Sequence, residues 1–91
     1  MQPKTYRKKP VEILAVQFDG TKESANRILA WIGQHEGVAR RAHRAEPGRG
    51  IVIDTLEGEM TISVEDFVIR GVKGEFYPCK PDIFAATYEA V

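Results

Sequence analysis

The chain has 91 residues, of which 43% are hydrophobic and 29% are charged, and its 13 basic side chains balance 13 acidic ones. This mixture excludes a chain that is disordered throughout, and the length predicts one domain over residues 1–91. Zero net charge argues against duplex nucleic acid as the partner, because proteins that bind it are normally basic.

The charges are unevenly distributed along the chain. Residues 1–50 contain ten Lys or Arg against five Asp or Glu, whereas residues 51–91 contain three against eight. One interpretation is a basic interaction surface, and the other is attraction between the halves, within the fold or across a subunit interface. The second is favoured because the whole chain is neutral.

Cysteine content and hydropathy predict where the protein resides. Cys79 is the single cysteine, so no internal disulfide can form, which is typical of a reducing compartment. No apolar run approaches the ~20 residues of a membrane-spanning helix, and we expect no signal peptide. The sequence therefore predicts a cytoplasmic location, no membrane partner and no cofactor.

Residues 11–18 are rich in apolar and β-branched side chains and predict the first strand. Because apolar groups fall on both faces of this strand, we expect it to lie in the centre of a sheet. A helix follows, with Thr21 as its N-cap and Gly33 as its C-terminal stop, or Gly37 as a later one. Its buried stripe, at the spacing of helical turns, consists of Ala25, Ile28, Leu29 and Ile32.

The segments 51–56 and 59–64 predict a β-hairpin. A two-residue loop, Glu57-Gly58, would pair Ile53 with Ile62 and gather the apolar residues on one face, and a four-residue loop has the same parity. That face would consist of Ile51, Ile53, Met60, Ile62 and Val64. The preceding residues 38–50 are compatible with an edge strand or an exposed loop.

Residues 67–88 combine glycines, prolines and aromatic rings. Residues 67–70 predict a strand, and a tight turn at Lys73-Gly74 would set Gly71 opposite Phe76. Because proline cannot donate to a ladder, Pro78 and Pro81 predict that the next strand lies at a sheet edge or ends irregularly. Asp82 is expected to cap a short C-terminal helical turn. Residues 88–91 are expected to form a final short strand.

The predicted fold class is α+β. We expect a small, mainly antiparallel sheet of four to six strands, with one amphipathic helix packed on one face and a short helical turn near the C-terminus.

The chain contains five recognisable segments, namely Tyr6-Arg7-Lys8-Lys9-Pro10, Ala15-Val16-Gln17-Phe18, Thr55-Leu56-Glu57-Gly58, residues 71–84 and Thr87-Tyr88-Glu89. Together these segments resemble a family of short uncharacterised phage and prophage proteins. At residues 64–66 this chain has Val-Glu-Asp where many members carry Pro-Gly-Asp. The resemblance implies a phage origin and a role in infected or lysogenic bacterial cells, and it supplies no reaction.

Cations from both ends of the chain, together with aromatic rings near the C-terminus, are the candidate ligand-binding residues. Cations can contact phosphate, rings can stack on a base, and glycines permit a close backbone approach. A solvated basic face is the plainer interpretation. The candidate set is Lys8, Lys9, Lys73, Gly74, Glu75, Tyr77, Cys79, Lys80 and Tyr88.

Catalytic patterns are weaker. Cys79 beside Lys80 could be a reactive thiolate, but the candidate bases His35 and His43 have no placed relation to it. The acidic residues at two turns are typical of solvated loops.

We therefore expect a non-enzymatic phage accessory protein that binds and sequesters a nucleotide-type small molecule to counter host defence. The alternatives are a module that inhibits or redirects a host protein and, more weakly, a small nucleotide-cleaving enzyme. We also expect a homo-oligomer, first of all a dimer that buries Phe76, Tyr77 or Phe84.

Overall fold

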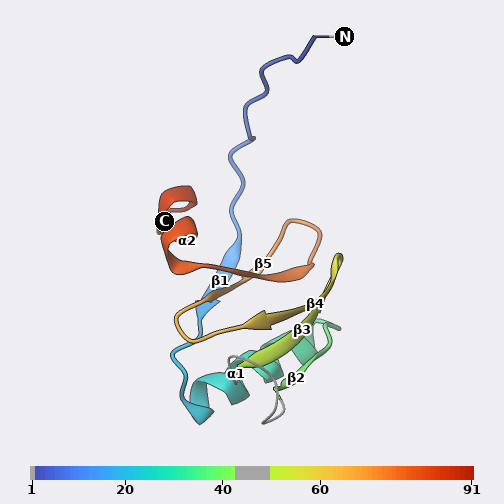
Figure 1. Cartoon of the computed structure of the whole chain (residues 1–91), viewed down its shortest axis with the longest axis vertical. Helices are drawn as coiled ribbons and strands as arrows, with labels where there is room; N and C mark the ends of the chain where they lie inside the picture. The colour runs from blue at the N-terminus through green and yellow to red at the C-terminus, as the bar shows by residue number, and fades with distance from the viewer. Residues whose placement is uncertain (1, 43–49) are drawn as a thin grey trace.

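The computed structural model describes residues 2–42 and 50–91 and confirms the α+β class. Figure 1 shows α2 and the N-terminal segment at one end of the molecule and α1 at the other. None of the helices in these residues is both long and apolar enough to cross a membrane. The elements in chain order are β1 (Leu14–Gln17), α1 (Lys22–Gln34), β2 (Ala39–Arg41), β3 (Ile51–Thr55), β4 (Gly58–Ile62), β5 (Phe67–Arg70), β6 (Phe76–Cys79) and α2 (Pro81–Thr87).

The six strands form two antiparallel sheets of three strands each, where the sequence had suggested one sheet. Sheet A has the order β1-β5-β6 and sheet B the order β2-β3-β4. β6 lies against β3 and β4, so the two sheets share one core that α1 closes. The buried core residues are Phe18, Ala25, Ile28, Ile32, Ile51, Ile53, Ile62, Val68 and Phe76.

The start of α1 is as predicted. The Thr21 side chain accepts a hydrogen bond from the Ser24 backbone N–H at 3.1 Å, which satisfies one of the unpaired donors of the first turn. Ala25, Ile28 and Ile32 are buried, and Leu29 packs beside them. The stripe read from the sequence is therefore the face that α1 turns to the core.

The end of α1 differs from the first choice, because the helix continues through Gly33 to Gln34. Gly37 donates its N–H to the Ile32 carbonyl at 2.9 Å, and Glu36, at φ +66°, donates to the Gly33 carbonyl at 3.2 Å. These two bonds are those of a Schellman motif, with a glutamate in the left-handed position. Gly37 is required, since a Cβ there would lie 2.5 Å from the Ile32 side chain.

β1 is an edge strand, so the prediction of a central strand over residues 11–18 was wrong. Its pairing begins only at Leu14, which lies opposite Arg70. Residues 11–13 have no partner because β5 ends at Arg70 and the chain turns at Gly71. Leu14 is 60% exposed, and Val16, on the same face of β1, is 39% exposed.

The β3–β4 hairpin has an even-length loop, as predicted, but the loop consists of Leu56 and Glu57. Gly58 pairs with Thr55 and supplies the positive φ of the turn, at +103°, so Glu57 need not adopt that conformation. The observed register differs from the predicted one by two residues, so the same side chains stay on the apolar face. Ile51, Ile53 and Ile62 on that face are buried. Met60 and Val64 are exposed instead.

The β5–β6 hairpin has a three-residue loop, Val72-Lys73-Gly74, so the predicted register was wrong. Phe76 lies opposite Arg70 rather than opposite Gly71. A two-residue Lys73-Gly74 loop would require positive φ at Lys73. In the observed loop that conformation falls on Gly74 alone, at +81°.

The remaining C-terminal and edge predictions have mixed outcomes. β6 is at the edge of sheet A, as Pro78 requires, and Pro81 opens α2 at its first position. Asp82 lies in the first turn but is not the cap, because the N-cap is Lys80. Residues 88–91 form no strand. Residues 39–41 form the edge strand β2, and the rest of that basic segment, residues 43–49, lies outside the described residues.

Candidate ligand-binding pocket

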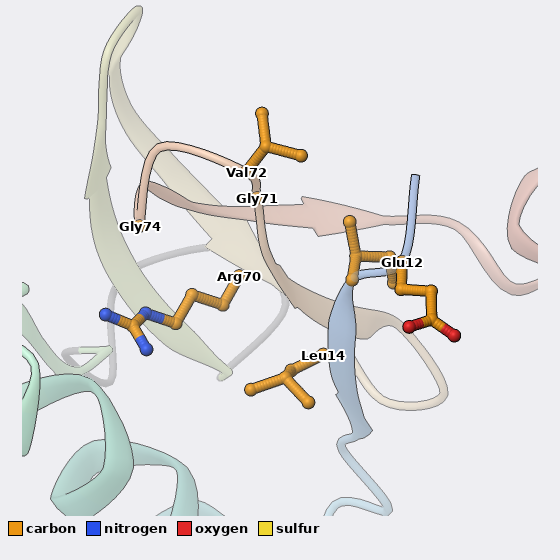
Figure 2. Close-up of a pocket in the computed structure, with 7 residues that line it drawn as sticks. Glu12, Leu14, Arg70, Gly71, Val72 and Gly74 are labelled. Atoms are coloured by element: carbon orange, nitrogen blue, oxygen red, sulfur yellow. The ribbon is translucent and has the colours of Figure 1, made fainter. Parts of the chain in front are cut away.

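A hollow of about 320 Å³ lies where the start of β1 meets the β5–β6 loop (Figure 2). Two segments almost sixty residues apart in sequence form its walls, because β1 and β5 are paired. The lining residues are Glu12, Ile13, Leu14, Arg70, Gly71, Val72 and Gly74.

Arg70 is the cation of this hollow. It is the last residue of β5, and its guanidinium carbon lies 5.9 Å from the centre of the Phe76 ring. Its Nε is buried and has no hydrogen-bond acceptor, and no carboxylate among residues 2–42 and 50–91 forms an ion pair with it. A buried donor without an acceptor is destabilising, so this arginine is an unusual feature in a small domain.

The loop beside Arg70 is held in one conformation. Gly71 donates to the Glu75 carbonyl at 2.7 Å and accepts from the Gly74 N–H at 3.0 Å. The Glu75 carboxylate accepts from the Lys73 N–H at 2.9 Å. A Cβ at Gly71 would lie 2.5 Å from that carboxylate, so any other residue there would displace the Glu75 side chain. The loop therefore presents a rigid backbone wall to the hollow.

The other walls are apolar except at one point. Ile13, Leu14 and Val72 supply aliphatic surface, and Leu14 and Val72 are largely exposed. Glu12 adds a carboxylate at the rim, and Figure 2 shows it directed away from the guanidinium of Arg70. Such a hollow suits a small ligand that has an anionic group at the Arg70 end and an apolar or planar body.

The residues selected from the sequence do not form one site. Gly74 lines the Arg70 hollow, and Lys73 is exposed at the tip of its loop. Glu75 and Tyr77 line a second hollow of about 310 Å³ between the β3–β4 turn and β6. Lys9 is exposed in the N-terminal segment. The remaining four residues lie around α2 and the end of β6.

Lys8, Tyr77 and Tyr88 meet beside α2. The Lys8 ammonium lies 5.4 Å from the centre of the Tyr88 ring, which is a cation–π contact. Burial, followed by a hydrogen bond with the Tyr88 side chain, raises the pKa of Tyr77 to about 12. The Tyr88 ring packs 5.1 Å from Phe84, which stacks on Phe67 at 3.8 Å. These ring contacts pack α2 against sheet A.

Lys80 and Cys79 have local partners. The Lys80 ammonium lies 3.1 Å from the carboxylate of Asp66, which is only 2% exposed. Burial, then the charges of Asp66 and Asp82, raise the pKa of the Cys79 thiol, so its proton is retained. Lys80 is thus engaged by Asp66, and the thiolate suggested by the Cys79-Lys80 sequence is opposed by its surroundings.

Arg70 and the apolar wall of Ile13 and Leu14 were missed in the sequence. The available signal was a cation directly after the apolar run Phe-Val-Ile, on the same strand face as the buried Val68. His35, considered as a base, packs 6.5 Å from the Phe76 ring. Among residues 2–42 and 50–91, no three His, Cys, Asp or Glu side chains are grouped closely enough to hold a metal ion.

Comparison with known proteins adds no assignment: no family model, no curated protein and no solved structure matches the chain.

Proposed function

We propose that the protein acts by binding a small anionic molecule of nucleotide type in the hollow beside Arg70. The observation that carries the proposal is Arg70, which lines a hollow of about 320 Å³ and whose buried Nε has no acceptor. A phosphate or carboxylate oxygen is the acceptor that an arginine fork recognises best. In the cell, a phage-encoded protein of this kind would sequester such a molecule and so counter host defence.

The size and composition of the hollow support a ligand of modest dimensions. A volume of about 320 Å³ is near the lower end of the ~300–1,000 Å³ of small-molecule pockets, which suits one phosphate and part of a nucleoside. Lys73, on the adjoining loop, offers a second cation. A rigid loop loses little conformational entropy when a ligand binds, so affinity does not require many contacts.

A binding role is favoured over catalysis by the state of Cys79. Its raised pKa keeps the thiol protonated, and a protonated thiol is a poor nucleophile. Of the two histidines, His35 packs near Phe76, and His43 lies outside the described residues. The protein would therefore capture its ligand and leave it unchanged.

The test is a ligand screen with a matched pair of variants. Thermal unfolding of the wild-type protein is recorded with linear and cyclic nucleotides, and calorimetry follows for any that raise the Tm. Arg70→Met keeps the length and packing of the side chain and removes the charge, and Arg27→Met does the same on the exposed face of α1. We expect Arg70→Met to weaken binding at least tenfold and Arg27→Met to leave it unchanged.

Two outcomes would contradict the proposal. If no nucleotide raises the Tm of the folded protein, a ligand of this class is excluded, and a host protein becomes the partner to seek. If a nucleotide binds equally well to the wild type and to Arg70→Met, the hollow beside Arg70 is not its site. Affinity that rests on a phosphate contact should fall as the salt concentration rises, and this dependence should disappear in Arg70→Met.

A further inference from the structure

The sequence and position of β1 disagree with each other. Residues 11–18 read Val-Glu-Ile-Leu-Ala-Val-Gln-Phe, with apolar groups on both faces, which is typical of a central strand covered on both faces. In the structure only Leu14–Gln17 pair, and they pair on one side only, with β5. No other strand of residues 2–42 and 50–91 adjoins the second edge of β1.

That second edge has unpaired backbone groups. Phe18 donates its N–H to the Asp66 carbonyl at 2.9 Å, so the backbone groups of Phe18 and, by alternation, Val16 and Leu14 face β5. Those of Ala15 and Gln17 therefore face outward. No proline or lysine interrupts this edge between residues 11 and 18, although such residues commonly protect free edges from pairing. Leu14 and Val16 are 60% and 39% exposed.

We infer that the free edge of β1 pairs with β1 of a second copy of this chain, antiparallel, about a two-fold axis. The pairing satisfies the outward groups of Ala15 and Gln17 and brings Leu14 and Val16 of the two copies together on one face. It joins two copies of sheet A into one six-stranded sheet. A two-fold dimer is the commonest closed assembly of identical chains.

The charge distribution specifies the antiparallel direction. Residues 2–12 are exposed and continue away from the body in line with β1 (Figure 1). Residues 1–10 carry four basic and no acidic side chains, which leaves nine basic and 13 acidic in residues 11–91. In an antiparallel pair, this basic segment passes the far end of the partner's β1, where three exposed carboxylates lie. They are Asp19, Glu23 and Glu65.

Parallel pairing would instead place the two basic segments side by side, where like charges repel. The dimer expected from the sequence, which buries Phe76, Tyr77 or Phe84, is not the one inferred here. Phe76 is buried in the core of its own chain, and Phe84 stacks on Phe67.

The direct test is amide hydrogen exchange with sedimentation equilibrium on the full chain. We expect a particle of twice the chain mass, in which the Ala15 and Gln17 amides are as slow to exchange as that of Val16. A monomer at all concentrations would overturn the inference. So would a dimer in which the Ala15 and Gln17 amides exchange as fast as those of residues 2–12, because its interface would lie elsewhere.

Two proline variants complete the test. Ala15→Pro removes one outward N–H and spares the bonds between β1 and β5, and we expect it to raise the Kd of the dimer at least tenfold. Arg41→Pro is the matched control, because Ala42 bonds to Gly50 and Arg41 therefore faces outward at the edge of β2. We expect this variant to remain a dimer. An Ala15→Pro protein that folds and dimerises like the wild type would refute the pairing, and the exchange data decide if it does not fold.

Discussion

The ion pair between Asp66 and Lys80 offers the sharpest test of which residues hold the fold together. Asp66 is 2% exposed and accepts two hydrogen bonds, from the Ser63 N–H at 2.9 Å and from the Lys80 ammonium at 3.1 Å. Its own carbonyl accepts from the Phe18 N–H. The side chain of Asp66 thus joins the turn before β5 to the residue after β6, and its backbone carbonyl joins both to the residue after β1.

The magnitudes follow from the exposure of each partner. A hydrogen bond to a charged acceptor contributes about 1.5–3 kcal/mol, whereas an ion pair with an exposed partner contributes about 0.2–1 kcal/mol. The Lys80 side chain is 58% exposed. We therefore expect Asp66→Ala to lower the free energy of unfolding by about 2–4 kcal/mol and Asp66→Asn by about 1–2 kcal/mol, since the amide oxygen still accepts from Ser63. Lys80→Met should lower it by about 1 kcal/mol.

The assay is urea unfolding followed by the fluorescence of Trp31, the single tryptophan, whose ring packs 5.1 Å from Phe76 in the core. All variants are compared at one protein concentration, because association changes apparent stability. Lys73→Met is the control, since Lys73 is exposed on a loop and should change stability by no more than about 0.5 kcal/mol. If Lys80→Met behaves like this control and Asp66→Ala is tolerated, Asp66 does not anchor the turn.

Three further predictions concern groups with unusual surroundings. Because the pKa of Tyr77 is raised to about 12 from an ordinary 10, the folded state should lose stability as the pH rises from about 10 to 12, and Tyr77→Phe should flatten that loss. The Cys79 thiol should react with a neutral alkylating reagent several-fold more slowly than a free thiol at neutral pH, because its pKa is raised. Glu36→Gly and Glu65→Gly should each raise stability by about 0.5–1 kcal/mol, since both glutamates have positive φ, whereas Gly37→Ala should lower it by about 2 kcal/mol or more.

Each of these has a clear contrary result. A wild-type alkaline unfolding profile in Tyr77→Phe would show that another group titrates there. Alkylation of Cys79 at the rate of a free thiol would mean that burial and the nearby carboxylates do not act on it. A loss of stability in Glu65→Gly would show that the hydrogen bond from Gln17 to the Glu65 carboxylate, at 3.3 Å, outweighs the backbone strain.

The sequence predicted the elements whose information is local. The helix followed from the spacing of Ala25, Ile28 and Ile32 and from a capping threonine, all within twelve residues. The even loop of the β3–β4 hairpin followed from the need to gather isoleucines on one face. The length of the β5–β6 loop did not follow from the sequence. It depends on Gly74 at the last loop position and on the Glu75 side chain, which lies over Gly71.

The site was less accessible to sequence reasoning, since it depends on contacts between distant segments. Lys80 was selected as a free cation, but the carboxylate that engages it is fourteen residues earlier and becomes buried only in the fold. The sequence signal of Arg70 is weak, because an arginine at the end of a strand is ordinary. What distinguishes it, a buried Nε without an acceptor, arises from packing against Phe76 and the adjoining loop.

The placement of β1 against β5 has a consequence for the order in which the chain folds. Sheet B and α1 use contacts within residues 22–62, whereas sheet A must bring positions 17 and 67, fifty apart, into register. The entropy of closing that loop is lost before β1 gains a single contact, unless the intervening elements have already shortened it. We expect α1 and the β3–β4 hairpin to form first and β1 to join last. Substitutions at Leu14 or Val16 should then change the unfolding rate and leave the refolding rate nearly unaltered, which stopped-flow kinetics would measure.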